Sequence, residues 1–202
     1  MIKGRVRSCI TGMALTPCLV TAVIMDVDLA ARLAYLFQEN DMRILNDQFR
    51  DALYRQADAS PRLRAHERLH EKSQDPVQRI VVGLRRGTYI PPHKHPAGQD
   101  WELFQVVDGD IKLLIFNDEG MVKQTLRLGP DNDTFAVQMP PNTVHSMVCM
   151  SDHALFIEVK QGPYREEDAK LVMRWAPSEG EEQAADYVKR LEEAATGNVL
   201  TR

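Results

Sequence analysis

Three histidines and one glutamate in the middle of the chain have the residue types and the spacing of a metal site. His93 and His95 are two positions apart, so both side chains project from one face of an extended strand. Glu102 begins the next predicted strand, which a hairpin would return beside the histidines, and His145 comes from a distant strand. Three imidazoles and one carboxylate suit Fe, Zn, Mn, Ni or Co. The sequence therefore predicts one divalent transition metal ion, with coordination positions left open for substrate or water.

Each of these residues also has an ordinary explanation. A His-x-His pair is common in polar loops, Glu102 could pair with Lys94, and His145 could be a satisfied core histidine. The four residues together, on strands that a barrel would bring close, favour the metal site over these separate explanations.

The chain around these residues has the pattern of an antiparallel fold with many short strands. Runs rich in β-branched and aromatic residues alternate with turn signals such as Asp108–Gly109 and Pro140–Asn142. This pattern predicts an all-β sandwich or barrel, the jelly roll included. The predicted strands are Val77–Leu84, Trp101–Val107, Ile111–Phe116, Met121–Leu128, Thr134–Met139, Thr143–Met150 and Ala154–Lys160, with a short extended piece at Thr88–Pro92.

Short helices are expected near the two ends of this region. Asn46 or Asp47 has the residue type of an N-cap, Ser60–Pro61 closes the helix, and Arg43–Leu45 could form a short strand before it. The face of a final helix is predicted at Ala184, Val188, Leu191 and Ala195. We therefore expect a helical lead-in and connector at 42–75, the barrel at 76–178 and a polar helical tail at 179–202.

The first 41 residues differ from the rest. A basic start and an apolar stretch over Cys9–Met25 resemble a signal peptide, but polar residues interrupt the stretch and no clear cleavage site follows. The stretch is also too short and too polar for a membrane span. An over-extended start, with translation beginning at Met25 or Met42, ranks first, a leader second and a membrane anchor last.

The composition excludes several classes of partner. The 202 residues carry a formal net charge of −4 with both signs scattered, so no basic surface argues for nucleic acid or an anionic membrane. Cys9, Cys18 and Cys149 make no disulfide framework, which suits a reducing compartment. We therefore expect a cytoplasmic protein whose partner is a small molecule.

One short motif points to a different chemistry. His66–Glu67–Arg68–Leu69–His70 matches the zinc-protease string H-E-x-x-H, which works only on a helix, where both histidines share a face. Arginines and a lysine crowd this segment, which is not the apolar helix such a site needs. A polar connector over the barrel mouth is the preferred interpretation, and a middle one places His66 or His70 near the ligand pocket.

The predicted ligands also lie in two motifs that resemble those of the cupin family. Gly87, His93, His95, Glu102 and Gly109 resemble the first cupin motif, and Pro140 followed by His145 resembles the second. The spacer between His95 and Glu102 is longer than usual, which raises Asp100 as a rival ligand. Asn142 stands where the second motif has glycine, and asparagine also tolerates a left-handed turn. The resemblance implies a cupin barrel, a double-stranded β-helix with jelly-roll-like architecture.

A narrower resemblance covers about Met42 to Glu179. Several strings resemble the WbuC family of cupin-fold metalloproteins, namely Asp75–Arg79, Trp101–Phe104, Glu158–Lys160, Gly162–Tyr164 and Trp175–Pro177. Members usually begin near the position of Met42, which supports an over-extended start. The family is associated with bacterial surface-polysaccharide gene clusters, so the resemblance implies a sugar or sugar nucleotide as ligand, and cupins in general imply a homodimer.

Three further residues are candidates for contact with that ligand: Arg79, Lys160 and Tyr164. Arg79 opens the first barrel strand, and Lys160 shares a face with Glu158 near the end of the last one. An inward pair would flank the cavity, whereas an outward pair would be a surface salt bridge of little energetic value. The first functional hypothesis is a metal-dependent enzyme acting on a small polar substrate. The alternative is a non-catalytic module that binds a carbohydrate or an acid.

Overall fold

The computed structural model describes residues 42–95, 101–164 and 170–202, so the expectation for residues 1–41 lies outside the described residues. The chain divides into two compact units at Leu45, and the fold below is that of the second unit, Asn46–Arg202.

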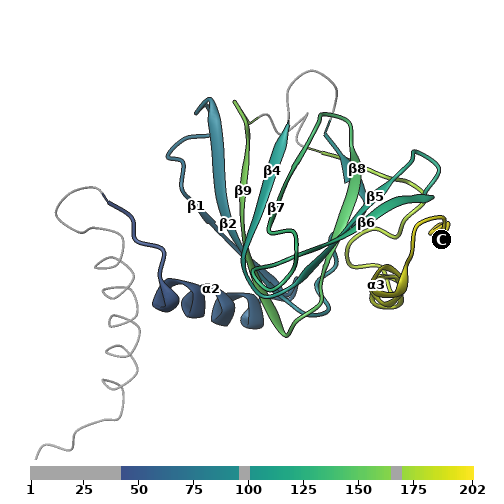
Figure 1. Ribbon diagram of the computed structural model, residues 1–202, viewed down its shortest axis with the longest axis horizontal. Helices are drawn as coiled ribbons and strands as arrows, with labels where there is room; N and C mark the ends of the chain where they lie inside the picture. Colours follow the sequence, from purple (N-terminus) through teal and green to yellow (C-terminus); the bar gives the residue numbers. More distant parts are fainter. Residues whose placement is uncertain (1–41, 96–100, 165–169) are drawn as a thin grey trace, which may run out of the picture. The chain divides into compact units, whose positions relative to one another are not determined.

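Two five-stranded antiparallel sheets form the body of this unit (Figure 1). The first sheet has the order β1-β2-β9-β4-β7, and the second has the order β10-β3-β8-β5-β6. The strands are β1 (Arg64–Arg68), β2 (Val77–Arg85), β3 (His93–Lys94), β4 (Glu102–Asp108), β5 (Ile111–Phe116), β6 (Val122–Leu128), β7 (Ala136–Met139), β8 (Val144–Cys149), β9 (His153–Gln161) and β10 (Leu171–Val172). The all-β, cupin-like sandwich predicted from the sequence is thereby confirmed.

Seven strands, β2 and β4 to β9, lie where the sequence predicts them, and the differences concern short or charged segments. The predicted strand at Arg43–Leu45 and the extended piece at Thr88–Pro92 are not strands, and β3 begins one residue later, at His93. β1 falls in the segment expected to be a connector. Its sequence RAHER lacks an apolar stripe, and it is a strand because its backbone pairs along its whole length with β2.

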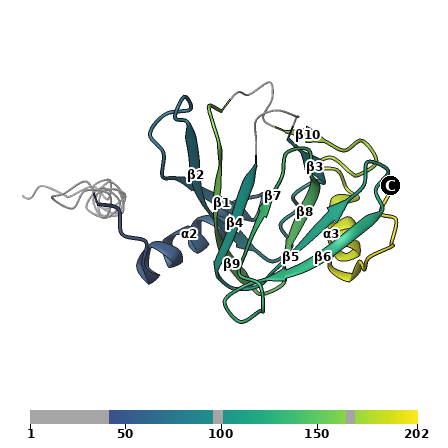
Figure 2. The same ribbon diagram turned by 45° about the horizontal axis from the view of Figure 1, so that its top comes forward.

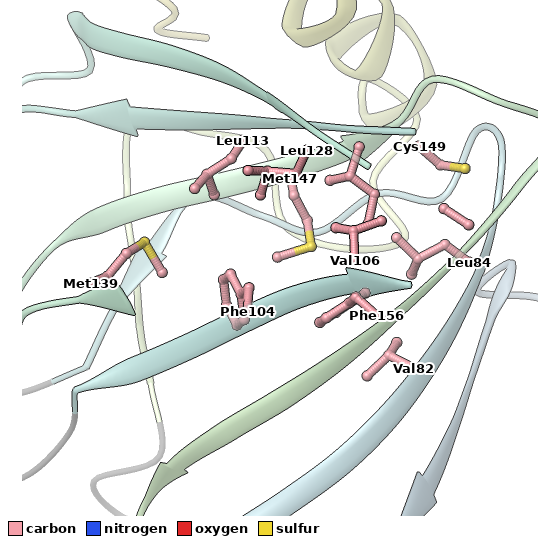
Figure 3. Close-up of a cluster of buried hydrophobic side chains, with 12 residues drawn as sticks. Val82, Leu84, Phe104, Val106, Leu113, Leu128, Met139, Met147, Cys149 and Phe156 are labelled. Carbon is pink, nitrogen blue, oxygen red and sulfur yellow. The ribbon is translucent and has the colours of Figure 1, made fainter. Parts of the chain in front are cut away.

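A hydrophobic core fills the space between the sheets (Figure 3). Phe104 and Phe156 project from the first sheet and meet Leu113 and Met147 from the second, and the two phenylalanine rings pack edge to face at 5.5 Å. This core takes the inward residues of each strand, as the alternation of a half-buried strand requires.

Each sheet also carries a helix on its outer face (Figure 2). α2 (Asp47–Ala59) is capped at its N-terminus by Asn46, whose side chain accepts a hydrogen bond from the Phe49 backbone, and its Leu53 packs on the first sheet. α3 (Ala184–Glu193) covers the second sheet with Tyr187, Val188 and Leu191, all buried. The predicted polar tail therefore contains a helix that completes a second core. Neither helix is long and apolar enough to cross a membrane, nor is any other helix in the described residues.

Candidate metal centre

Three strands bring the predicted ligands together at one end of the main core. His93 on β3 lies directly opposite His145 on β8, and His95 follows β3 by one residue. Glu102 is the first residue of β4, on the same face as Phe104. The Phe104 ring contacts the His145 ring at a centroid distance of 5.8 Å, so apolar side chains form one wall of the cluster.

The geometry of the cluster suits a single ion. Ligand nitrogens of His93, His95 and His145 all lie within 4.8 Å of one another, and the three residues are buried. Glu102, which is 4% exposed, places Oε1 3.0 Å from His95 Nε2 and Oε2 3.5 Å from His145 Nε2. The three imidazoles thus form a buried group that could hold a metal ion, and the Glu102 carboxylate lies beside it through its contacts with His95 and His145.

Backbone carbonyls fix which ring nitrogen of two histidines carries the proton. Nδ1 of His93 lies 2.9 Å from the carbonyl oxygen of Pro91, and Nδ1 of His145 lies 2.9 Å from that of Thr143. A carbonyl can only accept, so each Nδ1 donates and each Nε2 keeps its lone pair. Metal-binding histidines are commonly oriented by such a bond on the far ring nitrogen.

The cluster also holds all the unsatisfied buried side-chain nitrogens and oxygens found in the described parts of the chain. These atoms are His95 Nδ1, His95 Nε2 and His145 Nε2, since the close approach of Glu102 lacks hydrogen-bond alignment. A buried polar atom without a partner costs about 1–3 kcal/mol. The gathering of several such atoms at one point is explained if they are metal ligands.

Burial and mutual proximity set the charges of these groups. Burial lowers the pKa of His93 well below its usual value, and the neighbouring His145 and His95 lower it further. Burial also lowers the pKa of His145, although Glu102 opposes this effect. Burial would raise the pKa of Glu102, but contact with His95 and the charges of His145 and His95 lower it overall. Neutral imidazoles and an ionised carboxylate are the forms that bind metal ions.

The two turns beside the motifs explain the residues found there. Asn142 has φ +63°, so asparagine takes the left-handed position at which the second motif usually has glycine, as predicted. Gly109 has φ +74°, and a Cβ atom there would lie 2.3 Å from the His153 carbonyl oxygen. Asp100, the rival ligand, lies outside the described residues.

A pocket of about 290 Å³ opens above the cluster. Its apolar walls are Ile80, Val82, Ile90, Phe104, Met147 and Phe156. Its polar lining, besides the four predicted ligands, consists of Arg62, Arg64, His66, Glu158, Lys160, Tyr164 and Lys170. Such a mixture of apolar walls and a few polar groups is typical of a small-molecule site.

Two of the three predicted ligand contacts line this pocket. Lys160 and Glu158 point inward and lie 3.0 Å apart, and Lys160 stands directly opposite Glu102 in the sheet. Tyr164 also lines the pocket and is partly exposed. Arg79 does not, because it lies on the opposite face of β2 from Ile80 and donates a hydrogen bond to the Leu69 carbonyl. The expectation that Arg79 faces the ligand is therefore corrected.

The H-E-x-x-H string has no helix. His66 lies on β1 and at the pocket mouth, whereas buried His70 follows the strand and bonds through Nδ1 to the Arg79 backbone. The interpretation that placed one of these histidines near the pocket holds for His66. The sequence analysis missed Arg62, Arg64 and Lys170 as lining residues, because they follow no motif and reach the pocket only through β1 and the segment before β10.

The sheet order, the core and the buried three-histidine cluster define a protein of cupin fold. A family model described as "Domain of unknown function (DUF6016)" matches residues 45–128. No curated protein matches the chain.

Solved structures of low similarity include one that is described as a cupin domain. KdgF from Halomonas sp. is 20% identical, with a TM-score of 0.41, over 54% of this chain and 86% of that one. Oxalate oxidase in complex with glycolate is 16% identical, with a TM-score of 0.43, over 56% and 57%. The cupin domain of Cnp3 from Schizosaccharomyces pombe is 15% identical, with a TM-score of 0.38, over 48% and 64%. The fold assignment rests on the strand order and core described above.

Proposed function

We propose that the protein binds one divalent transition metal ion through His93, His95, Glu102 and His145. The observation that carries the proposal is the set of buried ring nitrogens without hydrogen-bond partners, gathered where the three imidazoles meet. The proton positions on His93 and His145 support it, because both leave Nε2 able to bind. The ion is Fe, Zn, Mn, Ni or Co, the metals that such a ligand set accepts.

The bound ion would polarise and orient oxygen atoms of a small ligand. Four protein ligands leave about two positions open on a six-coordinate ion, which suits a bidentate diol or hydroxy acid. With the resemblance to the WbuC family, this favours a sugar or sugar nucleotide of surface-polysaccharide metabolism as ligand. Lys160 and Tyr164 line the pocket and are the residues we expect to contact it.

An enzyme is the first form of this proposal, and one feature of the pocket favours it. Glu158 is a pocket carboxylate outside the three-histidine cluster, held 3.0 Å from Lys160. Such a group could take a proton from a ligand in the pocket or return one to it. The alternative is a non-catalytic module that holds the same ligand. Ligand binding without turnover by metal-loaded protein would favour the module.

Elemental analysis of purified protein tests the metal site. We expect close to one transition metal ion per chain, and loss of most of it in the His93→Ala, His145→Ala double variant. His153→Ala is the matched control, since His153 lies outside the pocket and pairs with Asp58. Full metal content in the double variant would overturn the proposal.

Calorimetry with sugars tests the ligand. We expect Lys160→Ala to weaken binding while the metal stays in place, and Arg79→Ala to have no effect, because Arg79 lies on the other face of β2. Equal binding to metal-loaded and metal-stripped protein would contradict the proposed coordination. The homodimer, the cytoplasmic location and the absence of nucleic-acid and membrane partners stay predictions.

A further inference from the structure

One side of the pocket carries more positive charge than its described neighbours neutralise. Four cationic side chains line the pocket, and one of them, Lys160, is paired with Glu158. The other three are Arg62, Arg64 and Lys170, which come from the start of β1 and from the segment just before β10. This side of the pocket therefore differs in charge balance from the wall that β9 forms, where Lys160 is paired with Glu158.

A single carboxylate serves both arginines. Glu179 accepts from Arg62 Nε at 2.7 Å and from Arg62 Nη2 at 2.9 Å, and its two oxygens lie 2.7 and 2.8 Å from Arg64 Nη2. The Arg64 side chain is 4% exposed, and its Nη1 donates to the Tyr89 carbonyl, whereas the Arg62 side chain is 52% exposed. Buried charges are normally balanced by a partner, so two guanidiniums on one carboxylate leave an excess of positive charge.

Lys170 adds to this excess. It makes no hydrogen bond or ion pair with the rest of the described chain. Burial lowers its pKa, and so do Arg64, Arg62 and Lys160, against the opposing effect of Glu179. Burial and Arg62 likewise lower the pKa of Arg64. These cations are therefore close enough to disfavour one another, and an anion among them would relieve the repulsion.

We infer that Arg62, Arg64 and Lys170 form a subsite for an anionic group, a phosphate or a carboxylate, of the molecule that enters this pocket. Arg62 and Lys170 would contact the anion, and the more deeply buried Arg64 would add its positive charge beneath them. A planar guanidinium binds two oxygens of such a group at once. The anion subsite does not depend on the proposed function. Only the idea that the other end of the same molecule reaches the metal rests on that proposal.

Glu179 is then an internal anion that occupies the guanidiniums when no ligand is bound. This assignment makes a prediction that a purely structural ion pair does not. Replacing Glu179 by glutamine removes the competing charge, so external anions should bind more tightly. If Glu179 only ties the C-terminal segment to β1, the same change lowers stability and does not improve anion binding.

Inorganic phosphate is the probe, titrated by calorimetry into the full-length protein with and without its metal. A parallel titration with succinate tests a carboxylate in place of phosphate. We expect phosphate to bind in both metal states. Arg62→Gln and Lys170→Met should each weaken it by about tenfold, and Glu179→Gln should strengthen it by a similar factor. Lys189→Gln is the matched control, because Lys189 is an exposed lysine on α3 paired with Asp186. Tighter binding of phosphate or of succinate assigns the chemistry of the anion.

Two outcomes would overturn the inference. One is the absence of binding by both anions, and the other is phosphate binding that disappears with the metal and is unchanged in Arg62→Gln. Arg62 is half exposed, so its variant stays informative if Glu179→Gln fails to fold. Metal analysis of each sample separates the two proposals. If phosphate binds to protein that never takes up metal, the metal site is refuted and the anion subsite is not.

Discussion

Removing the metal should destabilise the protein by an amount that follows from the site. A ligand present at 100 times its Kd stabilises the folded state by about 2.7 kcal/mol. For a domain of about 150–250 residues, each kcal/mol shifts Tm by about 2–4 °C, so chelation should lower Tm by about 5–11 °C. The assay is thermal unfolding of Asn46–Arg202 within the full chain, followed with and without a chelator.

The His145→Ala variant should lose most of this response. Disturbing only the residues that orient a metal ligand lowers affinity by about 10–100-fold, and removing a ligand should do at least as much. A 100-fold loss at the same metal concentration leaves about 0.4 kcal/mol of stabilisation, or about 1–2 °C. His153→Ala should keep the full response, whatever its own Tm. A metal-dependent shift of wild-type size in His145→Ala would refute the reasoning.

Three further predictions concern the stability and the metal content of the protein. The metal-stripped protein should become less stable as pH falls below about 6.5. Burial lowers the pKa of His93 and His145 in the folded protein, so below that pH the unfolded chain binds more protons than the folded one. A flat stability profile from pH 7 to 5 would contradict the burial of both rings. Leu191→Ala should cost about 2–5 kcal/mol because its side chain is fully buried under α3, and a loss below about 1 kcal/mol in urea unfolding would mean that the helix is dispensable. A chain shortened to begin at Met42 should keep its metal content and Tm, since Asn46–Arg202 is a compact unit by itself, and insolubility of that chain alone would show that the boundary is wrong.

The sequence predicts the strands and the grouping of His93 with His95 well because both depend on local spacing, whereas Glu102 as a fourth ligand stays a prediction. Two histidines at positions i and i+2 share a face in any strand, and the turn residues fix where each strand ends. The side of β2 on which Arg79 lies could not be predicted. Ile80 and Val82 face the pocket, but Val81 is also buried, under α2, so apolar residues occur on both faces.

The anion subsite was beyond the reach of sequence analysis for a related reason. In the last part of β9 the usual rule is reversed, since charged Glu158 and Lys160 face inward and Ile157 packs on the outer face. Arg64 enters the pocket from a strand without an apolar stripe, and its partner Glu179 lies far along the chain. Only tertiary structure brings such residues together.

The complete burial of β8 has a consequence for how the gene can vary. All six residues of Val144–Cys149 are buried, because the sheet has a core on each face, whereas β4 alternates between buried and less buried positions. A saturation mutagenesis library should therefore show an unbroken run of intolerant codons across β8 and a two-residue rhythm of tolerance across β4. The strand that carries His145 can change in sequence only through compensating pairs of substitutions in the layers on either side of it.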